Sequence, residues 1–401
     1  MATAGQASLC FGGLSIPPLA SYLTGEFSLS KTEYGSIMSI LYLGASFSSF
    51  PSGRLSDIFG VKIYLSISLI GMGLCVAAIF LAKSYFYLLL ISFFIGLGYG
   101  TANPATNRAI MMWFSRNTRG TAMSIKQSSV PIGGFLAALI MAPLAIYLGW
   151  RYAFLIGGLG IMFSSIFPLI FYKSFPVHPT VLSSSISSRT NKLSFKKLFT
   201  NKDLILISFI AAIFASVQIA IGTYLVLYLE EVALFSLAVA AAFLGLANAG
   251  GIVGRICWGI ISDRLLGGRR RIVLQIVACI SGLSALLISL YAYINTYINA
   301  GKWFLVPIVF ILGFTSIGWN GIYHAYLVEI AGKSLAGTAT GISLSVVFLG
   351  NVIGPLIFGL IVDLSGEYRY AWQFIVMLMS FSLIVLFLLK ETVSNAKQGA
   401  T

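Results

Sequence analysis

Three basic residues, Arg108, Lys126 and Arg255, fall inside long apolar stretches of this 401-residue chain. A charged side chain at the centre of a membrane-spanning helix costs about 2.5–3.5 kcal/mol on insertion scales, so such residues usually serve a function. All eleven carboxylates of the chain fall at the ends of these stretches or between them. Cations without a nearby carboxylate create a positive potential, and we therefore expect them to attract an anion.

The three cations differ in their predicted depth. Arg255 lies eight residues before Asp263, about 12 Å from the inner end of a helix that rises about 1.5 Å per residue. Lys126 lies seven residues after Arg119, a depth of about 10 Å by the same rise. Arg108 is shallower, and its long side chain can extend to the lipid headgroups. Arg255 and Lys126 are therefore the predicted anion-binding residues, with the alternative that they also extend to the membrane surface.

Polar and aromatic residues accompany these cations within the apolar stretches. Asn248 precedes Arg255 by two helical turns, with Gly251 between them leaving room for a ligand. On one stretch the members of two pairs are four residues apart and therefore share a helix face. The pairs are Trp319 with Tyr323 and Asn320 with His324. Four further candidates for lining a binding site are Gln218, Tyr224, Tyr99 and Asn103. Each residue could instead be a core aromatic or form a hydrogen bond between helices.

Residues suited to other chemistry are few. His324 titrates near neutral pH and is a candidate for proton coupling, with an uncharged histidine at a helix interface as the alternative. The four cysteines lie in apolar stretches without CxxC spacing, which favours small hydrophobic residues over disulfides or metal ligands. Because no GxxxxGK[ST] or HExxH motif is present, we expect neither a metal nor any other cofactor, and no enzyme activity.

Composition indicates which elements hold these residues. The chain is 58% hydrophobic and only 9% charged, with a mean hydropathy of +0.95. That excludes a soluble enzyme, a disordered tail and a nucleic-acid-binding module, and indicates an all-α membrane protein. Twelve apolar spans are predicted at 4–23, 34–52, 61–82, 85–112, 121–147, 150–172, 204–228, 237–262, 272–294, 303–327, 337–362 and 370–390.

The spans form two pseudo-symmetric halves of six helices each. We predict an N-terminal bundle at 1–172, a cytoplasmic linker at 173–203, a C-terminal bundle at 204–390 and a cytoplasmic tail at 391–401. The net charge of +14 mostly reflects how the chain is oriented in the membrane. Of the 25 Lys and Arg residues, 17 fall on the predicted cytoplasmic side and 5 on the outer side. This predicts a multi-pass plasma-membrane protein with both termini in the cytoplasm, a monomer in the lipid bilayer that does not bind nucleic acid.

One short motif occurs in both halves. The chain reads Gly-Arg-Leu-Ser-Asp-Ile-Phe-Gly-Val-Lys at 53–62 and Gly-Ile-Ile-Ser-Asp-Arg-Leu-Leu-Gly-Gly-Arg at 259–269. Asp57 and Asp263 stand at equivalent positions, 206 residues apart. Parallel repeats with a substrate site at their interface are a known transporter architecture.

These motifs resemble the signature loop of the major facilitator superfamily, G-x-L-[AS]-D-x-x-G-x-[RK]. The resemblance implies alternating-access transport and a gating role for a set of residues near the cytoplasmic face: Gly53, Asp57, Gly60, Lys62, Asp263, Arg264 and Arg269. The alternative is that the two aspartates are solvated surface charges. Around Arg255 the sequence also resembles the oxalate/formate exchangers and monocarboxylate transporters, which implies that this arginine contacts a carboxylate.

The sequence therefore predicts a secondary active transporter of a small organic anion, with a monocarboxylate as the favoured substrate. The exchangers carry a lysine in the eleventh span, and this chain does not. Our hypothesis is that Lys126, in the fifth span, takes the role of that lysine. A multidrug or hydrophobic-compound efflux transporter of the same fold is the first alternative, although such exporters usually carry an embedded acid. A membrane receptor without transport activity is the second.

Overall fold

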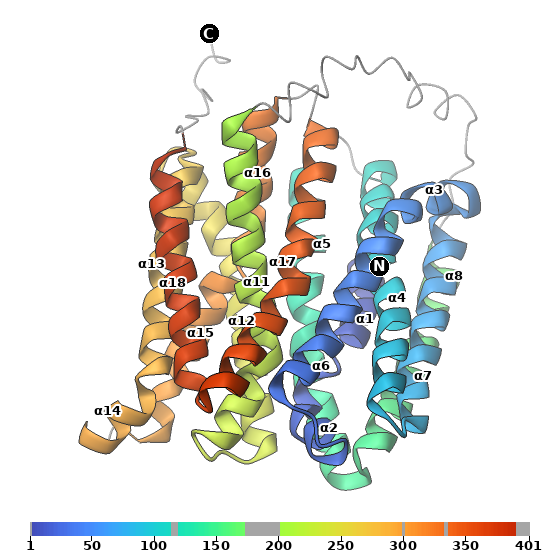
Figure 1. Cartoon of the computed structure of the whole chain (residues 1–401). Helices are drawn as coiled ribbons and strands as arrows, with labels where there is room; N and C mark the ends of the chain where they lie inside the picture. Colours follow the sequence, from blue (N-terminus) through green and yellow to red (C-terminus); the bar gives the residue numbers. More distant parts are fainter. Residues whose placement is uncertain (1, 114–118, 173–200, 299–300, 333–335, 390–401) are drawn as a thin grey trace.

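The computed structural model describes residues 2–113, 119–172, 201–298, 301–332 and 336–389, and within these ranges the chain forms helices and no strands (Figure 1). The first half contains α1 (Ala2–Gly13), η1 (Pro17–Leu19), α2 (Ala20–Glu26), α3 (Lys31–Ala78), η2 (Ile79–Leu81), α4 (Tyr85–Trp113), α5 (Arg119–Gln127), α6 (Ser129–Leu148), α7 (Trp150–Ser164) and α8 (Ile166–Phe171). The second half contains α11 (Lys202–Glu231), α12 (Leu237–Ile260), η3 (Ile261–Leu265), α13 (Arg270–Ser289), α14 (Tyr291–Ile298), η4 (Lys302–Phe304), α15 (Leu305–Ser316), α16 (Asn320–Ala331), α17 (Ala336–Ser365) and α18 (Tyr368–Phe387).

Ten helices in the described ranges are long and apolar enough to cross a membrane. They coincide with ten of the twelve predicted spans, and the other two spans correspond to α1 with α2 and to the first part of α3. The first span is not one helix, because Pro17 and Pro18 lack the N–H groups that would continue α1 and a 3-10 turn separates the two segments. The predicted all-α membrane fold is confirmed.

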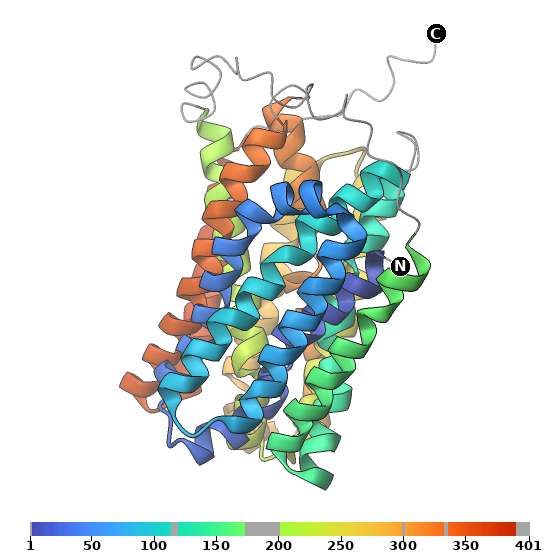
Figure 2. The same cartoon turned by 90° about the vertical axis from the view of Figure 1, so that its right-hand side faces the viewer.

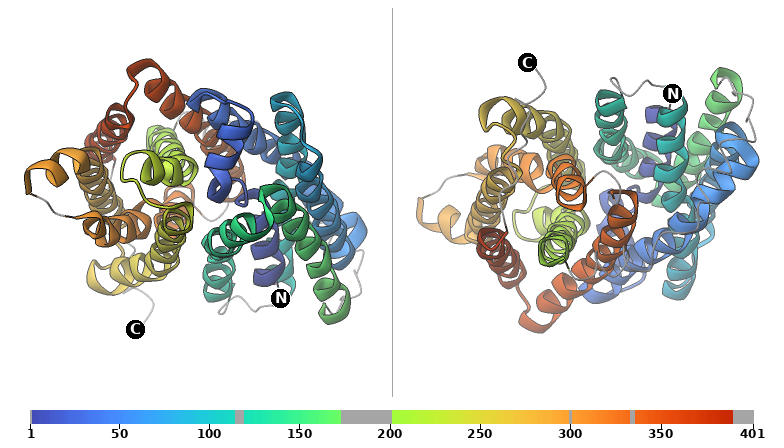
Figure 3. Two further views of the ribbon diagram at one scale, coloured as in Figure 1. Left: turned by 90° about the horizontal axis from the view of Figure 1, so that it is seen from below. Right: turned by 90° about the horizontal axis from the view of Figure 1, so that it is seen from above.

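The two halves form separate groups of helices that lie side by side (Figure 3). Viewed from the side of the first half, its long helices run through the height of the molecule (Figure 2). We call the end that carries α2 and α14 the outer end and the opposite end the inner end, following the orientation predicted from the charges (Figure 1). Most of the predicted linker, 173–200, and the predicted tail lie outside the described residues, whereas Lys202 and Asp203 already belong to α11.

The repeated motif of the first half lies within a bend of α3. Helical geometry continues through 53–59 and is interrupted only at Gly60, whose φ is 75° and ψ is 149°. A side chain strongly disfavours this left-handed backbone region, which explains why the motif carries glycine at this position. The predicted loop is thus a sharp turn between two helical segments.

Four residues join the two halves at the outer end, and we call them the outer contact: Lys31, Thr32, Glu231 and Asp363. Asp363, near the end of α17, accepts hydrogen bonds from the backbone N–H groups of Lys31 (2.9 Å) and Thr32 (2.7 Å) at the start of α3. It also accepts one from the Thr32 hydroxyl at 2.6 Å. The Lys31 Nζ lies 2.5 Å from Glu231 Oε1, at the end of α11.

Candidate functional site

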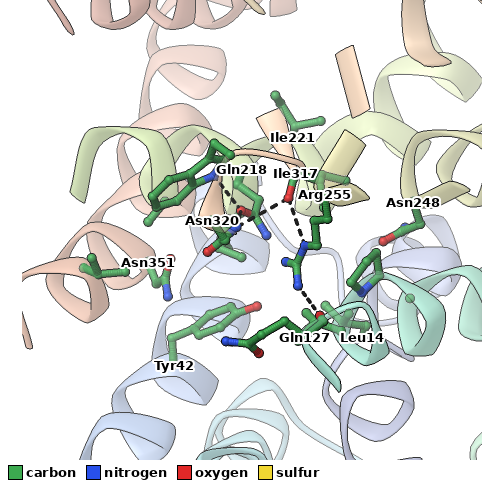
Figure 4. A pocket seen from close by; sticks show the side chains of 18 of the residues that line it. Leu14, Tyr42, Gln127, Gln218, Ile221, Asn248, Arg255, Ile317, Asn320 and Asn351 are labelled. Atoms are coloured by element: carbon green, nitrogen blue, oxygen red, sulfur yellow. Dashed lines mark hydrogen bonds between the residues drawn. The ribbon is translucent and has the colours of Figure 1, made fainter. Parts of the chain in front are cut away.

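A cavity lies between the two halves, with an empty volume of about 1180 Å³ that includes the open space at its margin. The walls include eight residues that the sequence singled out for binding or proton coupling: Arg255, Asn248, Gln218, Trp319, Asn320, Tyr99, Asn103 and His324. Further polar lining residues are Tyr42, Gln127 and Asn351 (Figure 4).

Arg255 extends from α12 across the boundary between the halves. Its position depends on Gly254, because a Cβ there would lie 2.1 Å from the carbonyl oxygen of Phe314, so only glycine lets α12 approach α15 this closely. The Arg255 Nε donates to the carbonyl of Ile317 at 3.3 Å, and Nη1 donates to the carbonyl of Gln127 in the other half (Figure 4). The guanidinium therefore bridges the halves through backbone oxygens.

Both acceptor carbonyls are at interruptions of helices. The carbonyl of Gln127 would normally accept from the N–H of residue 131, but that residue is Pro131, which has none. Ile317 lies between the end of α15 and the start of α16, where helical carbonyls lose their usual donors. Arg255 thus satisfies oxygens that the helices cannot, and none of the ion pairs in the described ranges involves it.

Lys126 does not face the cavity, although the sequence predicts that it binds the anion. Its side chain is fully buried, and it is not among the residues that line the cavity. The Nζ donates to Asn103 Oδ1 at 2.8 Å and to Asn107 Oδ1 at 2.7 Å, two amides that stand one turn apart on α4. The ammonium is therefore held inside the first half by neutral oxygens.

Carboxamides account for much of the polarity of the cavity. The Gln218 Oε1 accepts from Trp319 Nε1 at 3.0 Å and from Asn320 Nδ2 at 3.2 Å, which leaves its own NH₂ group as a donor. Asn248 donates to the carbonyl of Leu244 at 2.9 Å, one turn earlier on α12. Amide groups of this kind can pair with hydroxyls of a ligand as donors and as acceptors.

Two of the predicted residues, Tyr323 and Tyr224, face other partners, whereas His324 lines the cavity. The Tyr323 hydroxyl lies 2.5 Å from Ser343 Oγ on α17, and Tyr323 does not line the cavity. Tyr224 is part of the outer end, where its hydroxyl lies 2.6 Å from the carbonyl oxygen of Lys31. His324 lines the cavity with its ring centroid 4.8 Å from that of Tyr323, and its role in proton coupling stays a prediction.

The residues predicted for gating lie at the inner end. Asp263 forms an ion pair with Arg270 rather than with the predicted Arg264 or Arg269, both of which are exposed. Arg270 also contacts Glu329 on α16 at 3.2 Å, so the pair lies within the second half. Gly53 and Lys62 flank the turn at Gly60 in α3, whereas the side chain of Asp57 lies outside the described residues.

Several lining residues were not expected from the sequence. Gln127 and Asn351 are isolated amides in apolar spans, and this isolation was the available signal. Tyr42 contacts Tyr99 edge to face, with 5.7 Å between ring centroids. Among the described residues no group of three or more His, Cys, Asp or Glu side chains is suited to holding a metal ion.

Comparison with known proteins gives consistent results. A sequence model described as "Major Facilitator Superfamily" matches residues 2–351. A hexuronate transporter of Bacillus subtilis is 25% identical over 367 residues, which cover 88% of this chain and 84% of that protein. A probable hexose phosphate transport protein of Chlamydia trachomatis is 26% identical over 404 residues, which cover 94% and 86%.

A solved structure shows the same fold. The bacterial homologue of the human lysosomal transporter Spinster, in an inward-facing and occupied conformation, superposes with a TM-score of 0.75 at 19% identity. The match covers 96% of this chain and 95% of that one. The relatives are named for hexuronate and hexose phosphate and not for oxalate, formate or monocarboxylates, so that finer resemblance stays a prediction.

Proposed function

Because the chain belongs to the major facilitator superfamily, we propose that it is a secondary transporter of a small organic anion with a single carboxylate. Alternating access to the cavity between the two halves is part of this proposal. The observation that carries it is Arg255, a cavity-lining guanidinium whose described partners are two backbone carbonyls and not a carboxylate.

A substrate carboxylate competes well for this arginine. A carboxylate pairs a full negative charge with the guanidinium, whereas the carbonyls of Gln127 and Ile317 offer it only a neutral acceptor. A planar guanidinium can also form two parallel bonds with a carboxylate, which a single carbonyl cannot match. The bonds to Gln127 and Ile317 are therefore weak enough to be exchanged for a substrate and still satisfy the arginine without one.

The remaining lining residues favour a monocarboxylate that also carries hydroxyl groups. Gln218, Asn248 and Asn320 belong to a set of carboxamides that an unsubstituted short-chain acid would leave without partners. A hexuronate has one carboxylate and several hydroxyls, and a relative of this chain is named as a hexuronate transporter. That similarity supports a hydroxylated acid as the substrate class.

The two alternatives make different demands on the same cavity. An exporter of cationic drugs needs a buried acid, and no Asp or Glu is among the residues that line the cavity. An exporter of neutral hydrophobic compounds would leave Arg255 and the carboxamides without matching groups. A receptor would bind the anion without moving it, and only a flux measurement separates it from a transporter.

Binding by the purified protein tests the anion site. We expect isothermal titration calorimetry to detect D-glucuronate and to detect neither glucose nor the cationic dye ethidium. Arg255→Ala should weaken glucuronate binding about thirtyfold or more, because truncating one partner of a buried charge pair costs about 2–5 kcal/mol. Arg255→Lys keeps the charge without the planar guanidinium, so its affinity for glucuronate should lie between those of the natural protein and Arg255→Ala.

Thermal melting of the same variants checks folding. Because Arg255 is partly exposed to the cavity, water can replace it at the carbonyls of Gln127 and Ile317, and the melting temperature should stay nearly unchanged. Glucuronate binding by folded Arg255→Ala with the affinity of the natural protein would contradict the site assignment. Binding of ethidium in place of glucuronate would favour the drug exporter.

A further inference from the structure

Asn103 separates the ammonium of Lys126 from the cavity. It lines the cavity and is exposed there, whereas Lys126 is fully buried behind it. The Asn103 Oδ1 accepts from Lys126 Nζ at 2.8 Å and from Gln6 Nε2, on α1, at 3.0 Å. One side-chain oxygen thus satisfies donors from two other helices of the first half.

These contacts fix the orientation of the Asn103 amide. An amide oxygen has two lone pairs, and here both are used by donors inside the bundle. A lysine ammonium has donors only, so the oxygen and not the nitrogen of the amide must face it. What Asn103 can offer to the cavity is therefore its NH₂ group, a neutral donor in place of the charge behind it.

Resting on the proposed function, we propose that Asn103 is a specificity-determining residue that restricts the site to monoanions by screening Lys126. With the ammonium screened, Arg255 is the cation that a substrate can reach among the described residues that line the cavity. A second carboxylate or phosphate group on the substrate would be desolvated without a cationic partner, which is unfavourable. The screened lysine still supplies positive potential but no direct ion pair.

Removing the Asn103 amide should reverse this restriction. A substrate oxygen at the position of Asn103 Oδ1 would lie 2.8 Å from Lys126 Nζ and 3.0 Å from Gln6 Nε2. In an Asn103→Ala variant Gln6 Nε2 loses this acceptor and Lys126 Nζ loses one of two, keeping Asn107, so an anionic oxygen is favoured at that position. The variant thus gains a second anion subsite built from residues already in place.

Two sugar acids with the same carbon skeleton test the proposal. D-Glucuronate carries one carboxylate, and D-glucarate carries a second one at the other end of the chain. The natural protein should bind glucuronate more tightly, and in Asn103→Ala the ratio of the two dissociation constants should shift at least tenfold towards glucarate. Calorimetry on both purified proteins measures this ratio directly.

Two further variants identify the cause of the shift. In Asn103→Ala combined with Lys126→Met, the shift should disappear, because the second cation is gone. Asn107→Ala is the matched control, since Asn107 also binds Lys126, at 2.7 Å, but is not among the lining residues. It should leave the ratio as it is in the natural protein. Asn103→Ser replaces Asn103→Ala if thermal melting shows that the alanine variant does not fold.

The outcomes separate this inference from the proposed function. An unchanged ratio in folded Asn103→Ala, or an equal shift in Asn107→Ala, would overturn the role of Asn103 while leaving the anion site at Arg255 intact. Failure of the natural protein and of Asn103→Ala to bind either acid would overturn both proposals. A gain of glucarate binding that requires Lys126 would support the screening role.

Discussion

The outer and inner ends of the molecule use their charges differently. At the outer end, Asp363 and Glu231 of the second half bind residues at the start of α3 in the first half. At the inner end, Arg270 binds Asp263 and Glu329, and all three belong to the second half. In this structure the outer contact thus holds the two halves together, whereas the described inner-end pairs stabilise one half.

The geometry of the outer contact explains why it suits this purpose. The first turn of a helix has N–H groups without intrahelical acceptors and carries partial positive charge. Asp363 supplies a carboxylate from the other half to the N–H groups of Lys31 and Thr32, so it satisfies donors and complements the helix dipole together. We expect these bonds to break when the outer ends separate, and three substitutions test this difference between the ends.

The largest effect is expected from Asp363→Ala, which removes the acceptor of three hydrogen bonds between the halves. Losing about 1.4 kcal/mol of this contact would raise the population with separated outer ends about tenfold. Electron paramagnetic resonance distances between spin labels at Gly25 and Leu234, after replacement of the native cysteines, measure that population. Asp363→Asn keeps an acceptor without the charge and should have a smaller effect. An unchanged distance distribution in Asp363→Ala would contradict the role of the outer contact.

Arg270→Ala should affect stability without affecting the outer end. The substitution removes a hydrogen bond to Ser262 at 2.7 Å and ion pairs to Asp263 and Glu329. Because these partners lie in one half, we expect a lower melting temperature, by about 2–4 °C, and the same distances between the spin labels. Its exposed neighbour provides the control, since Arg269→Ala should change neither. A shift in the outer-end distances in Arg270→Ala would show that the two ends are coupled.

The smallest effect is expected from the ion pair between Lys31 and Glu231. Their side chains are 19% and 42% exposed, so water and salt screen the pair. A double-mutant cycle with Lys31→Met and Glu231→Gln should give a coupling energy of at most about 1 kcal/mol, measured through the same spin-label population. The coupling should vanish in 1 M NaCl. A larger value that resists salt would mean that this pair, rather than Asp363, dominates the outer contact.

The arrangement of helices was largely predictable from the sequence. Hydropathy located the spans because a lipid-exposed helix needs a continuous apolar stretch. Arg255, which lines the cavity, could be singled out because an embedded arginine without a carboxylate is rare and costly. Both predictions need only the order of apolar and charged residues along the chain, which the sequence gives directly.

The direction in which embedded side chains point was not predictable in the same way. Lys126 and its neighbour Gln127 are both polar, yet Gln127 lines the cavity and Lys126 is buried inside the first half, and the local sequence does not indicate which of the two faces the cavity. Tyr323 shares a face with Trp319 by spacing, yet its hydroxyl contacts Ser343 instead of the cavity. Whether such a side chain points into the cavity or towards another helix depends on how the neighbouring helices pack.

Contacts between residues distant in the sequence were also not predictable. Asp363 binds the start of α3 from 332 residues away, and no local pattern indicates that pairing. The bridge from Arg255 to Gln127 spans 128 residues. Here one local signal existed, because Pro131 leaves the carbonyl four residues earlier without a donor, and that carbonyl became the acceptor.

The most direct test of the central claim is glucuronate flux through the purified protein in liposomes. We predict saturable uptake of radiolabelled D-glucuronate by the natural protein, weaker uptake by Arg255→Lys, and uptake at the level of empty liposomes by folded Arg255→Ala. Excess unlabelled glucose should not compete. Equal uptake by the natural protein and by Arg255→Ala would contradict the assignment of Arg255 as the carboxylate contact, and glucuronate binding without any flux would contradict transport itself.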